Sequence, residues 1–305
     1  MKLRERGEQE TRGLLIQTEI LLAKWGIPRE ILLSHEDEMS NQSVLGMGGT
    51  VTRTLAIATN VFREVMRDRI LYLIGFYALA ILLANRLLPE IAAATEKKIL
   101  LDLVLAAMAV LSLVIAVFVG TGLVNKEIEK RTVFVLIAKP VSRSEFIVGK
   151  HLGLSAVLAV LISSMSAIAL GILQFAQVSF SLPNILISSS FLFLQLSLVT
   201  AIAILFGVFT SSLLATLFTF GIYLMGMASQ DIVKFGKLTK NPSIEAATQG
   251  LYLILPDLAR LDFKNQAVYN LIPSPEILLG SALYAGLYIV FVLAIASLIF
   301  SAREF

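Results

Sequence analysis

The chain has 305 residues, of which 57% are apolar and 15% are charged, and its mean hydropathy is +0.83. Soluble domains contain about 45–50% apolar residues, so this composition argues against a soluble protein and for one embedded in a membrane. The formal charge of +3 is small for this length, which argues against a nucleic-acid partner and is typical of basic loops beside a lipid surface.

Residues suited to catalysis and metal binding are few. The sequence contains no cysteine, which excludes thiol catalysis, disulfides and Cys-ligated metal sites. Its two histidines, His35 and His151, lie far apart along the chain and outside any HExxH motif. We therefore expect neither a metal site nor a catalytic site, and a membrane-embedded enzyme is a disfavoured class.

Residues 1–50 are polar and charged, apart from a modestly apolar stretch that Gly26 and Pro28 interrupt. That stretch is too short and too charged to span a bilayer. We expect a flexible cytoplasmic tail, and the alternative is an upstream extension with translation starting at Met47.

Residues 51–69 have the pattern of an amphipathic helix. Apolar residues recur at steps of three and four, and the charged residues fall largely on the other side. The apolar positions are Val51, Leu55, Ala58, Phe62, Val65 and Met66. The pattern predicts a helix in the cytoplasmic interface of the membrane, and the alternative is a helix that packs against the loops of the protein itself.

Six apolar segments have the length of membrane-spanning helices. They are residues 70–88, 102–124, 152–175, 184–208, 212–229 and 277–300. An uninterrupted helix over 184–229 would be roughly 69 Å long, about twice a bilayer core, so "FTSS" must form a tight reversal. The predicted fold class is all-α: a polytopic membrane protein with six transmembrane helices, preceded by the interfacial helix, over residues 51–305.

The positive charges between these segments predict the orientation. Residues 1–69 contain ten Lys and Arg, and residues 125–151 contain six. Both stretches are therefore expected in the cytoplasm. Residues 230–276 then form an external segment, and both termini lie on the cytoplasmic side of the inner (plasma) membrane.

Residues 125–151, "NKEIEKRTVFVLIAKPVSRSEFIVGKH", form a charged island between two apolar spans. Pro140 cannot continue a helix, and the spacing of Ser142 and Glu145 is that of a capping box that starts a new helix at Arg143. Before this break, four apolar residues form a ridge that a solvated loop does not need: Val133, Phe134, Leu136 and Ile137. We expect this ridge to dock into a groove on another protein.

This island resembles the signature loop of the membrane subunits of ABC type-2 exporters, in which a charged stretch leads into a short coupling helix and a Pro-Val-Ser-Arg corner. Residues 251–268, "LYLILPDLARLDFKNQAV", are similar to a segment of one branch of that family, which contains permeases of copper-site maturation and gliding-type systems. The resemblance covers about residues 50–305.

The resemblance implies a permease subunit that is not itself an enzyme and binds no cofactor. ATP would be bound by a separate cytoplasmic ABC ATPase, in agreement with the absence of a GxxxxGK[ST] motif from the sequence. A second permease copy or a paralogue would complete the transporter. The coupling residues that the resemblance implies are Glu127, Glu129, Lys130, Arg131, Phe134, Leu136, Pro140 and Arg143.

These residues also have plainer interpretations. The charged ones could be solvated beside the membrane, Phe134 and Leu136 could pack on the interfacial helix, and Arg143 could bind lipid head groups. Ser142 and Glu145 are expected to be structural caps.

The transport path is less well defined by the sequence. Gln195 is the best candidate for a polar group that faces a cavity or a dimer seam, because small hydroxyl residues in membrane helices more often pack helices together. No charged residue lies in the middle of a span, since Arg86 and Asp102 fall at span ends, and this favours amphipathic, lipid-like or neutral cargo. The alternative function is an ion- or proton-coupled secondary transporter or a channel, which would need carboxylates in the membrane or broken helices.

Overall fold

The structure is a computed structural model that describes residues 49–67, 70–91, 96–129, 142–239 and 241–302. The chain divides into two compact units, Met1–Thr52 and Arg53–Phe305. Nearly all of the expected tail, residues 1–50, lies outside the described part. The second unit includes the helix over residues 49–67 from Arg53 onwards.

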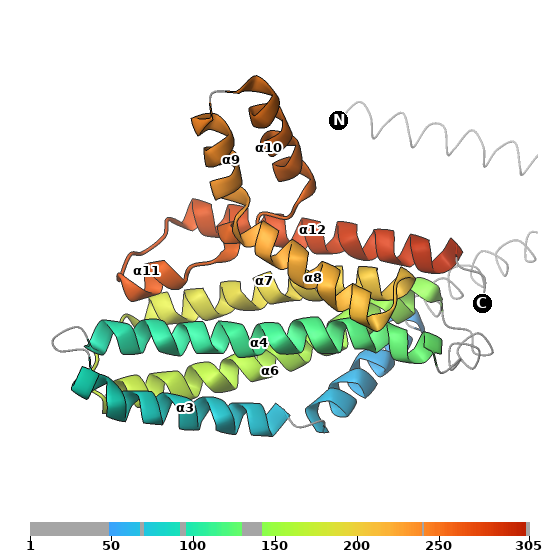
Figure 1. The fold of residues 1–305 in the computed structure, drawn as a ribbon. Coiled ribbons are helices and arrows are strands. Elements are labelled where there is room, and N and C mark those ends of the chain that lie inside the picture. The colour runs from blue at the N-terminus through green and yellow to red at the C-terminus, as the bar shows by residue number, and fades with distance from the viewer. Residues whose placement is uncertain (1–48, 68–69, 92–95, 130–141, 240, 303–305) are drawn as a thin grey trace, which may run out of the picture. The chain divides into compact units, whose positions relative to one another are not determined.

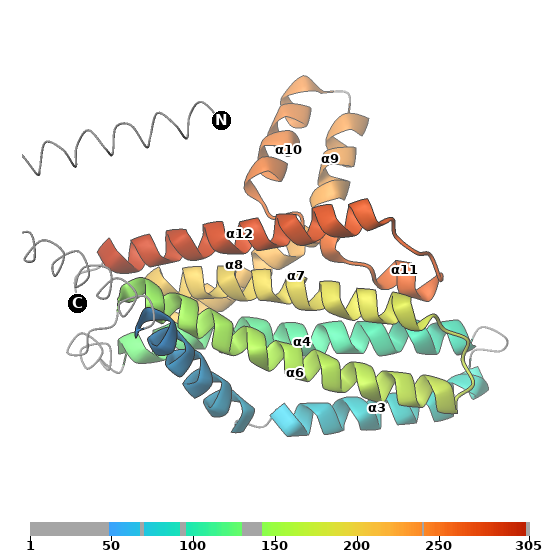
Figure 2. The ribbon, with the colours of Figure 1, turned by 180° about the vertical axis from the view of Figure 1, so that it is seen from behind.

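Five long helices run side by side and form the bundle (Figures 1 and 2). They are α3 (Ile70–Ile91), α4 (Glu96–Glu129), α6 (Arg143–Phe175), α7 (Leu182–Phe209) and α12 (Pro275–Ala302). Each is long and apolar enough to cross a membrane. Helices suit these apolar sequences because they satisfy backbone hydrogen bonds without water. The described residues contain no strand, so the predicted all-α membrane fold is confirmed.

Helix α7 lies at the centre of the bundle. It packs against α4, α6 and α12, and 72% of its most apolar window is buried inside the protein. Several polar side chains are buried along it, among them Ser188, Gln195 and Thr200. Helix α3 packs on α4 and α6 at one edge.

The fifth predicted span, residues 212–229, is part of a broken helix. The reversal expected at "FTSS" is present, since α7 ends at Phe209 and α8 (Ser212–Met227) begins three residues later. Helix α8 has 16 residues, which is about 24 Å and shorter than a bilayer core of about 30 Å. It bends by 56° into α9 (Ser229–Leu238). The described chain therefore has five spans, or six if this bent pair is one span.

The segment predicted to lie outside the membrane is largely helical. Helix α9 and helix α10 (Pro242–Ile254) form a hairpin that projects sideways from the bundle (Figures 1 and 2). The chain then returns through η1 (Ala259–Leu261) and α11 (Lys264–Val268). The turn of this hairpin lies between α9 and α10, whereas Pro256 and Asp257 form a buried bend that brings the chain back to the bundle.

The predicted amphipathic helix is present over residues 49–67. Its buried positions include Ala58, Val61 and Val65, whereas Val51 and Leu55 are more than half exposed. Val61 was not among the expected apolar positions, so the buried face is rotated from the predicted one. This rotation follows from packing against α6, which is described below.

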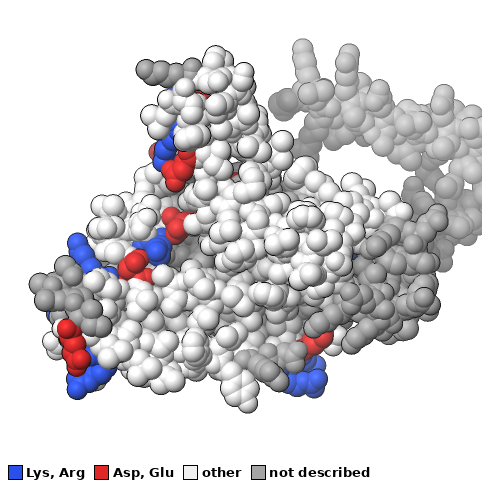
Figure 3. All heavy atoms as spheres, in the orientation of Figure 1, with Lys and Arg blue, Asp and Glu red and all other residues white. Residues whose placement is uncertain are grey.

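Apolar side chains dominate the surface of the bundle. On the face shown in Figure 3, the centre of the bundle carries almost no charged atoms, and the charged side chains lie near one end, on the hairpin and beside its base, and at the lower edge of the bundle. Large apolar residues such as Phe118, Leu213 and Leu287 are more than 60% exposed. A surface of this kind is stable in lipid and not in water, so the chain is a multi-pass membrane protein.

Candidate functional site

The predicted coupling residues divide into two groups. Glu127 and Glu129 belong to the last turn of α4, but their side chains are not described. Lys130, Arg131, Phe134, Leu136 and Pro140 lie outside the described residues. Their contact with an ATPase therefore stays a prediction, and the structure informs on the residues that follow.

The capping box at the start of α6 is present. The backbone N–H of Glu145 donates to Oγ of Ser142 at 3.1 Å, and the backbone N–H of Ser142 donates to Oε2 of Glu145 at 2.8 Å. Two N–H groups that a helix start would leave unpaired are thereby satisfied. As predicted, α6 begins at Arg143 and runs directly into a membrane span.

Arg143 and Glu145 connect this helix start to two other elements. The Arg143 guanidinium donates to the carbonyl oxygens of Phe300 at 2.8 Å and Ser301 at 2.7 Å. These carbonyls belong to the last turn of α12, where a cation also complements the helix dipole. The buried Glu145 carboxylate forms an ion pair with Arg53 of helix 49–67 at 3.5 Å.

Two glycines bring helix 49–67 into close contact with α6. A Cβ atom on Gly149 would lie 2.9 Å from side-chain atoms of Ile57, and a Cβ on Gly153 would lie 2.6 Å from the carbonyl oxygen of Ala58 and 2.7 Å from Cβ of Val61. Only glycine allows this approach. Gly149 and Gly153 are four residues apart and therefore share one face of α6, as in the small-residue motifs of membrane helices.

We call this region the α6 junction: residues 142–153 of α6, with Arg53, Ile57 and Val61 of helix 49–67 and Phe300 of α12. The rings of Phe146 and Phe300 stack with their centroids 5.5 Å apart. The junction begins directly after residues 130–141, the part of the 125–151 loop that lies outside the described residues. A displacement of this end of α6 would therefore move helix 49–67 and α12 with it, because packed elements shift together.

Farther along α6, a polar contact reaches the central helix. Nε2 of His151 lies 3.0 Å from the carbonyl oxygen of Ser197, and the hydroxyls of Ser155 and Ser197 are 3.1 Å apart. All three side chains are buried. His151 therefore has a structural partner in α7.

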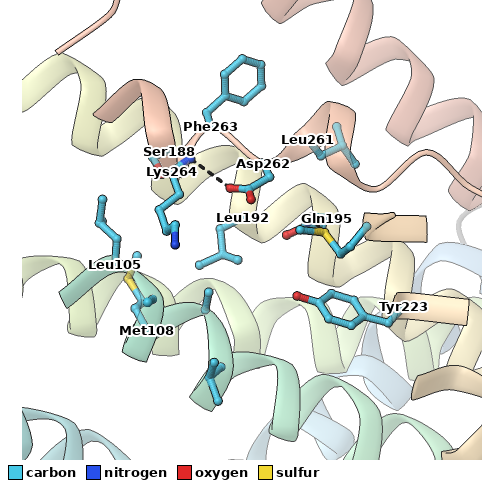
Figure 4. Close-up of a pocket in the computed structure, with 14 residues that line it drawn as sticks. Leu105, Met108, Ser188, Leu192, Gln195, Tyr223, Leu261, Asp262, Phe263 and Lys264 are labelled. Atoms are coloured by element: carbon cyan, nitrogen blue, oxygen red, sulfur yellow. Dashed lines mark hydrogen bonds between the residues drawn. The ribbon is translucent and has the colours of Figure 1, made fainter. Parts of the chain in front are cut away.

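A pocket of about 180 Å³ lies beside α7 (Figure 4). Apolar residues of α4 line one side, among them Leu105, Met108 and Val110, and Leu192 of α7 adds to them. The polar and charged lining residues are Ser188, Gln195, Tyr223, Asp262 and Lys264. They come from α7, α8 and the return segment after the hairpin.

Gln195 lines this pocket and also anchors the return segment. It is only 3% exposed, and its Nε2 donates to the carbonyl oxygen of Leu258 at 2.9 Å. The sequence pointed to Gln195 alone as a cavity residue. It did not indicate Asp262 or Lys264, because they belong to the segment 230–276 that was assigned to the outside. It did not indicate Tyr223, because that residue belongs to a predicted span without charged residues. The available signal was "DLARLDFK", in which charged residues stand among apolar ones directly after the apolar run "LYLILP".

A second polar cluster holds the base of the hairpin. The buried Asp257 carboxylate accepts hydrogen bonds from Ser229 Oγ at 3.0 Å and the Tyr252 hydroxyl at 3.1 Å, and from Gln230 Nε2 at 3.2 Å. Burial, and then the Asp257 charge, raise the pKa of Tyr252 above its ordinary value, so this phenol stays a donor. The cluster ties the start of α9, the end of α10 and the buried bend together.

The comparisons with known proteins agree with this architecture. A family model described as ABC-2 family transporter protein matches residues 55–305, which include the helix 49–67 from Leu55, the α6 junction apart from Arg53, the pocket and the hairpin. No curated protein matches the chain. The chain belongs to the ABC-2 family of transporter proteins.

Proposed function

We propose that the chain is the membrane-spanning permease subunit of an ATP-driven exporter, and that a separate cytoplasmic ATPase drives it through residues 125–151. The α6 junction is the observation that supports this most strongly. The loop that would bind the ATPase leads into a capped helix start that is tied to helix 49–67 and to the end of α12. Force applied to this loop would therefore reach two spans and the interfacial helix at once.

Within this proposal, Phe134 and Leu136 fill a groove on the ATPase, and Glu127, Glu129, Lys130 and Arg131 make polar contacts around it. Pro140 separates the docking helix from α6. Arg143 acts inside the permease, since its guanidinium holds the end of α12. Two permease chains, identical or paralogous, and two ATPases form the working transporter in the inner membrane, with the termini and residues 125–151 in the cytoplasm.

The test is purification of the tagged permease from its native membranes. An ABC ATPase with a phosphate-binding loop should co-purify with the unaltered permease. The double variant Phe134→Asp, Leu136→Asp should lose it, because a buried unpaired charge costs several kcal/mol at a docking groove. A matched double variant on the hairpin, Leu238→Asp, Leu253→Asp, changes two side chains that are 78% and 83% exposed and should retain the ATPase. Undiminished co-purification with the loop variant would overturn the coupling role.

A further inference from the structure

The pocket beside α7 carries an unbalanced negative charge. The Asp262 carboxylate accepts a hydrogen bond from the backbone N–H of Lys264 at 3.0 Å, and it forms no ion pair with any residue that the structure describes. The Lys264 ammonium is already paired with the Asp102 carboxylate of α4 at 3.2 Å. Asp102 does not line the pocket, but its pairing with Lys264 leaves the Asp262 carboxylate as the lining charge without an ion-pair partner among the described residues.

The other polar groups of the pocket add acceptors. Within the described chain, the Tyr223 hydroxyl has no hydrogen-bond partner, and Gln195 uses its Nε2 while its Oε1 accepts no hydrogen bond. Figure 4 shows the Tyr223 hydroxyl directed into the pocket, on the side where the Asp262 carboxylate lies. A carboxylate and an amide oxygen together favour a cation or a strong donor, and the Tyr223 hydroxyl oxygen can accept a further hydrogen bond.

The size and the apolar side of the pocket restrict the ligand further. Pockets that enclose a whole drug-sized molecule have about 300–1,000 Å³, so a cavity of about 180 Å³ accepts a head group or a single ring. Val110 lines the pocket and is 58% exposed, and Val114 and Phe118 continue its exposed apolar stripe along α4 at steps of four residues. A hydrocarbon chain attached to the bound head group would lie on this stripe.

We propose that this pocket binds the cationic head group of an amphipathic molecule whose hydrocarbon part lies along α4, and that amphipathic cations are the substrate class of the permease. The proposal that this pocket is a binding site rests only on the geometry of the pocket. The assignment as substrate rests on the proposed function.

Because the chain has no cysteine, a single Val110→Cys substitution reports on occupancy of the pocket. The variant is placed in phosphatidylglycerol nanodiscs without an ATPase, and its rate of reaction with a maleimide is measured in the presence of added compounds. Three probes share a twelve-carbon chain and differ in the head group: dodecyltrimethylammonium, dodecyldimethylamine N-oxide and dodecyl sulfate. Tetramethylammonium tests the head group alone. Leu283→Cys on α12, which is 59% exposed and lies outside the pocket lining, is the control for partition into the lipid.

We expect dodecyltrimethylammonium to protect the thiol of the Val110→Cys variant at concentrations about tenfold lower than the N-oxide, because one uncompensated charge in a partly buried site favours the cation by about that factor. Protection of the Leu283→Cys variant measures how much more strongly the cation partitions into the anionic bilayer, and the preference at Val110→Cys should exceed that ratio by about tenfold. Adding Asp262→Asn to Val110→Cys should remove the preference for the cation. Asp231→Asn, which removes the same charge from an exposed position on α9, should keep it.

Equal protection by all three head groups, preference for the sulfate, or an unchanged preference in the Asp262→Asn variant would overturn the site. If tetramethylammonium protected the thiol as well as dodecyltrimethylammonium does, the ligand would not need to be amphipathic, and that part of the proposal would be overturned. Failure of an ATPase to co-purify would instead overturn the proposed function and leave this binding result intact. Finally, in a complex with bound ATPase, dodecyltrimethylammonium should raise the rate of ATP hydrolysis, and no change in that rate would refute the assignment as substrate.

Discussion

Gly153 shows how strongly a single residue of α6 is constrained by its neighbour. A Cβ at this position would overlap backbone and side-chain atoms of helix 49–67, whereas a Cβ on Gly171 of the same helix would meet nothing within 4 Å. Both residues lie inside a helix, where alanine is intrinsically preferred to glycine. The two positions therefore separate packing from helix propensity.

We predict that Gly153→Ala lowers stability by about 1–3 kcal/mol, the usual cost of overpacking, and that Gly171→Ala leaves it unchanged or slightly higher. Thermal unfolding of the purified permease in detergent measures both. Equal midpoints for the two variants would show that helix 49–67 does not pack on α6 as described.

The capping box allows a second comparison between equivalent residues. Ser142 caps α6 with its side chain, whereas Ser211 occupies the same position before α8 and makes no side-chain cap hydrogen bond. Ser142→Ala should cost about 0.5–2 kcal/mol, and Ser211→Ala should cost little. Denaturant titrations in mild detergent would give both values, and a larger loss at Ser211 would contradict the assignment.

Local features of this kind were predictable from the sequence, and distant ones were not. The cap at Ser142 and Glu145 depends on residues three positions apart, so its pattern is visible in the sequence. The partner of Arg143 is more than 150 residues away, at Phe300 and Ser301. No spacing rule connects these positions, and only the fold brings them together.

At the scale of elements, the α9–α10 hairpin depends on its base. It projects from the bundle (Figures 1 and 2), and Asp257 joins the start of α9, the end of α10 and the bend that follows. The loss of such a network exposes neighbouring backbone amides to local unfolding.

We predict that Asp257→Asn speeds amide hydrogen exchange in residues 229–254 by about tenfold or more. The NH2 group of the new asparagine would face hydrogen-bond donors where the carboxylate oxygen accepted from them, so a buried polar group would be left unpaired. Asp231→Asn on the same hairpin breaks only an exposed ion pair and should leave exchange unchanged. Mass spectrometry of the exchanged peptides reads out both variants. Unaltered exchange in Asp257→Asn would mean that the base does not hold the hairpin.

The sequence predicted five of the spans well, because uninterrupted apolar runs of this length have few other stable conformations. It did not predict that α8 would be short and bend into α9, since composition carries no information on the contacts of Ser229 with Asp257. For the same reason it overlooked the position of Asp262 in the pocket.

At the scale of the whole molecule, the orientation in the membrane has a direct test. Ser144, beside the capping box, and Leu271, between α11 and α12, are both exposed. Ser144 belongs to residues 125–151 and Leu271 to residues 230–276, and the distribution of positive charges assigns these two segments to opposite sides of the membrane. In intact cells, a membrane-impermeant thiol reagent should label Leu271→Cys from outside and should label Ser144→Cys only after the membrane is opened. Labelling of both positions from one side would overturn the topology.

We propose that an ATPase acting on residues 125–151 changes the conformation of the bundle. The most direct measurement is the maleimide reaction rate of Val110→Cys in the complex with bound ATPase, compared between nucleotide-free and ATP-bound states. We predict that ATP changes this rate in the otherwise unaltered complex, because movement of the α6 junction is transmitted through the packed helices to the pocket. The rate in the Phe134→Asp, Leu136→Asp variant should not respond to ATP. An identical rate with and without ATP in a complex that binds and hydrolyses ATP would contradict the account.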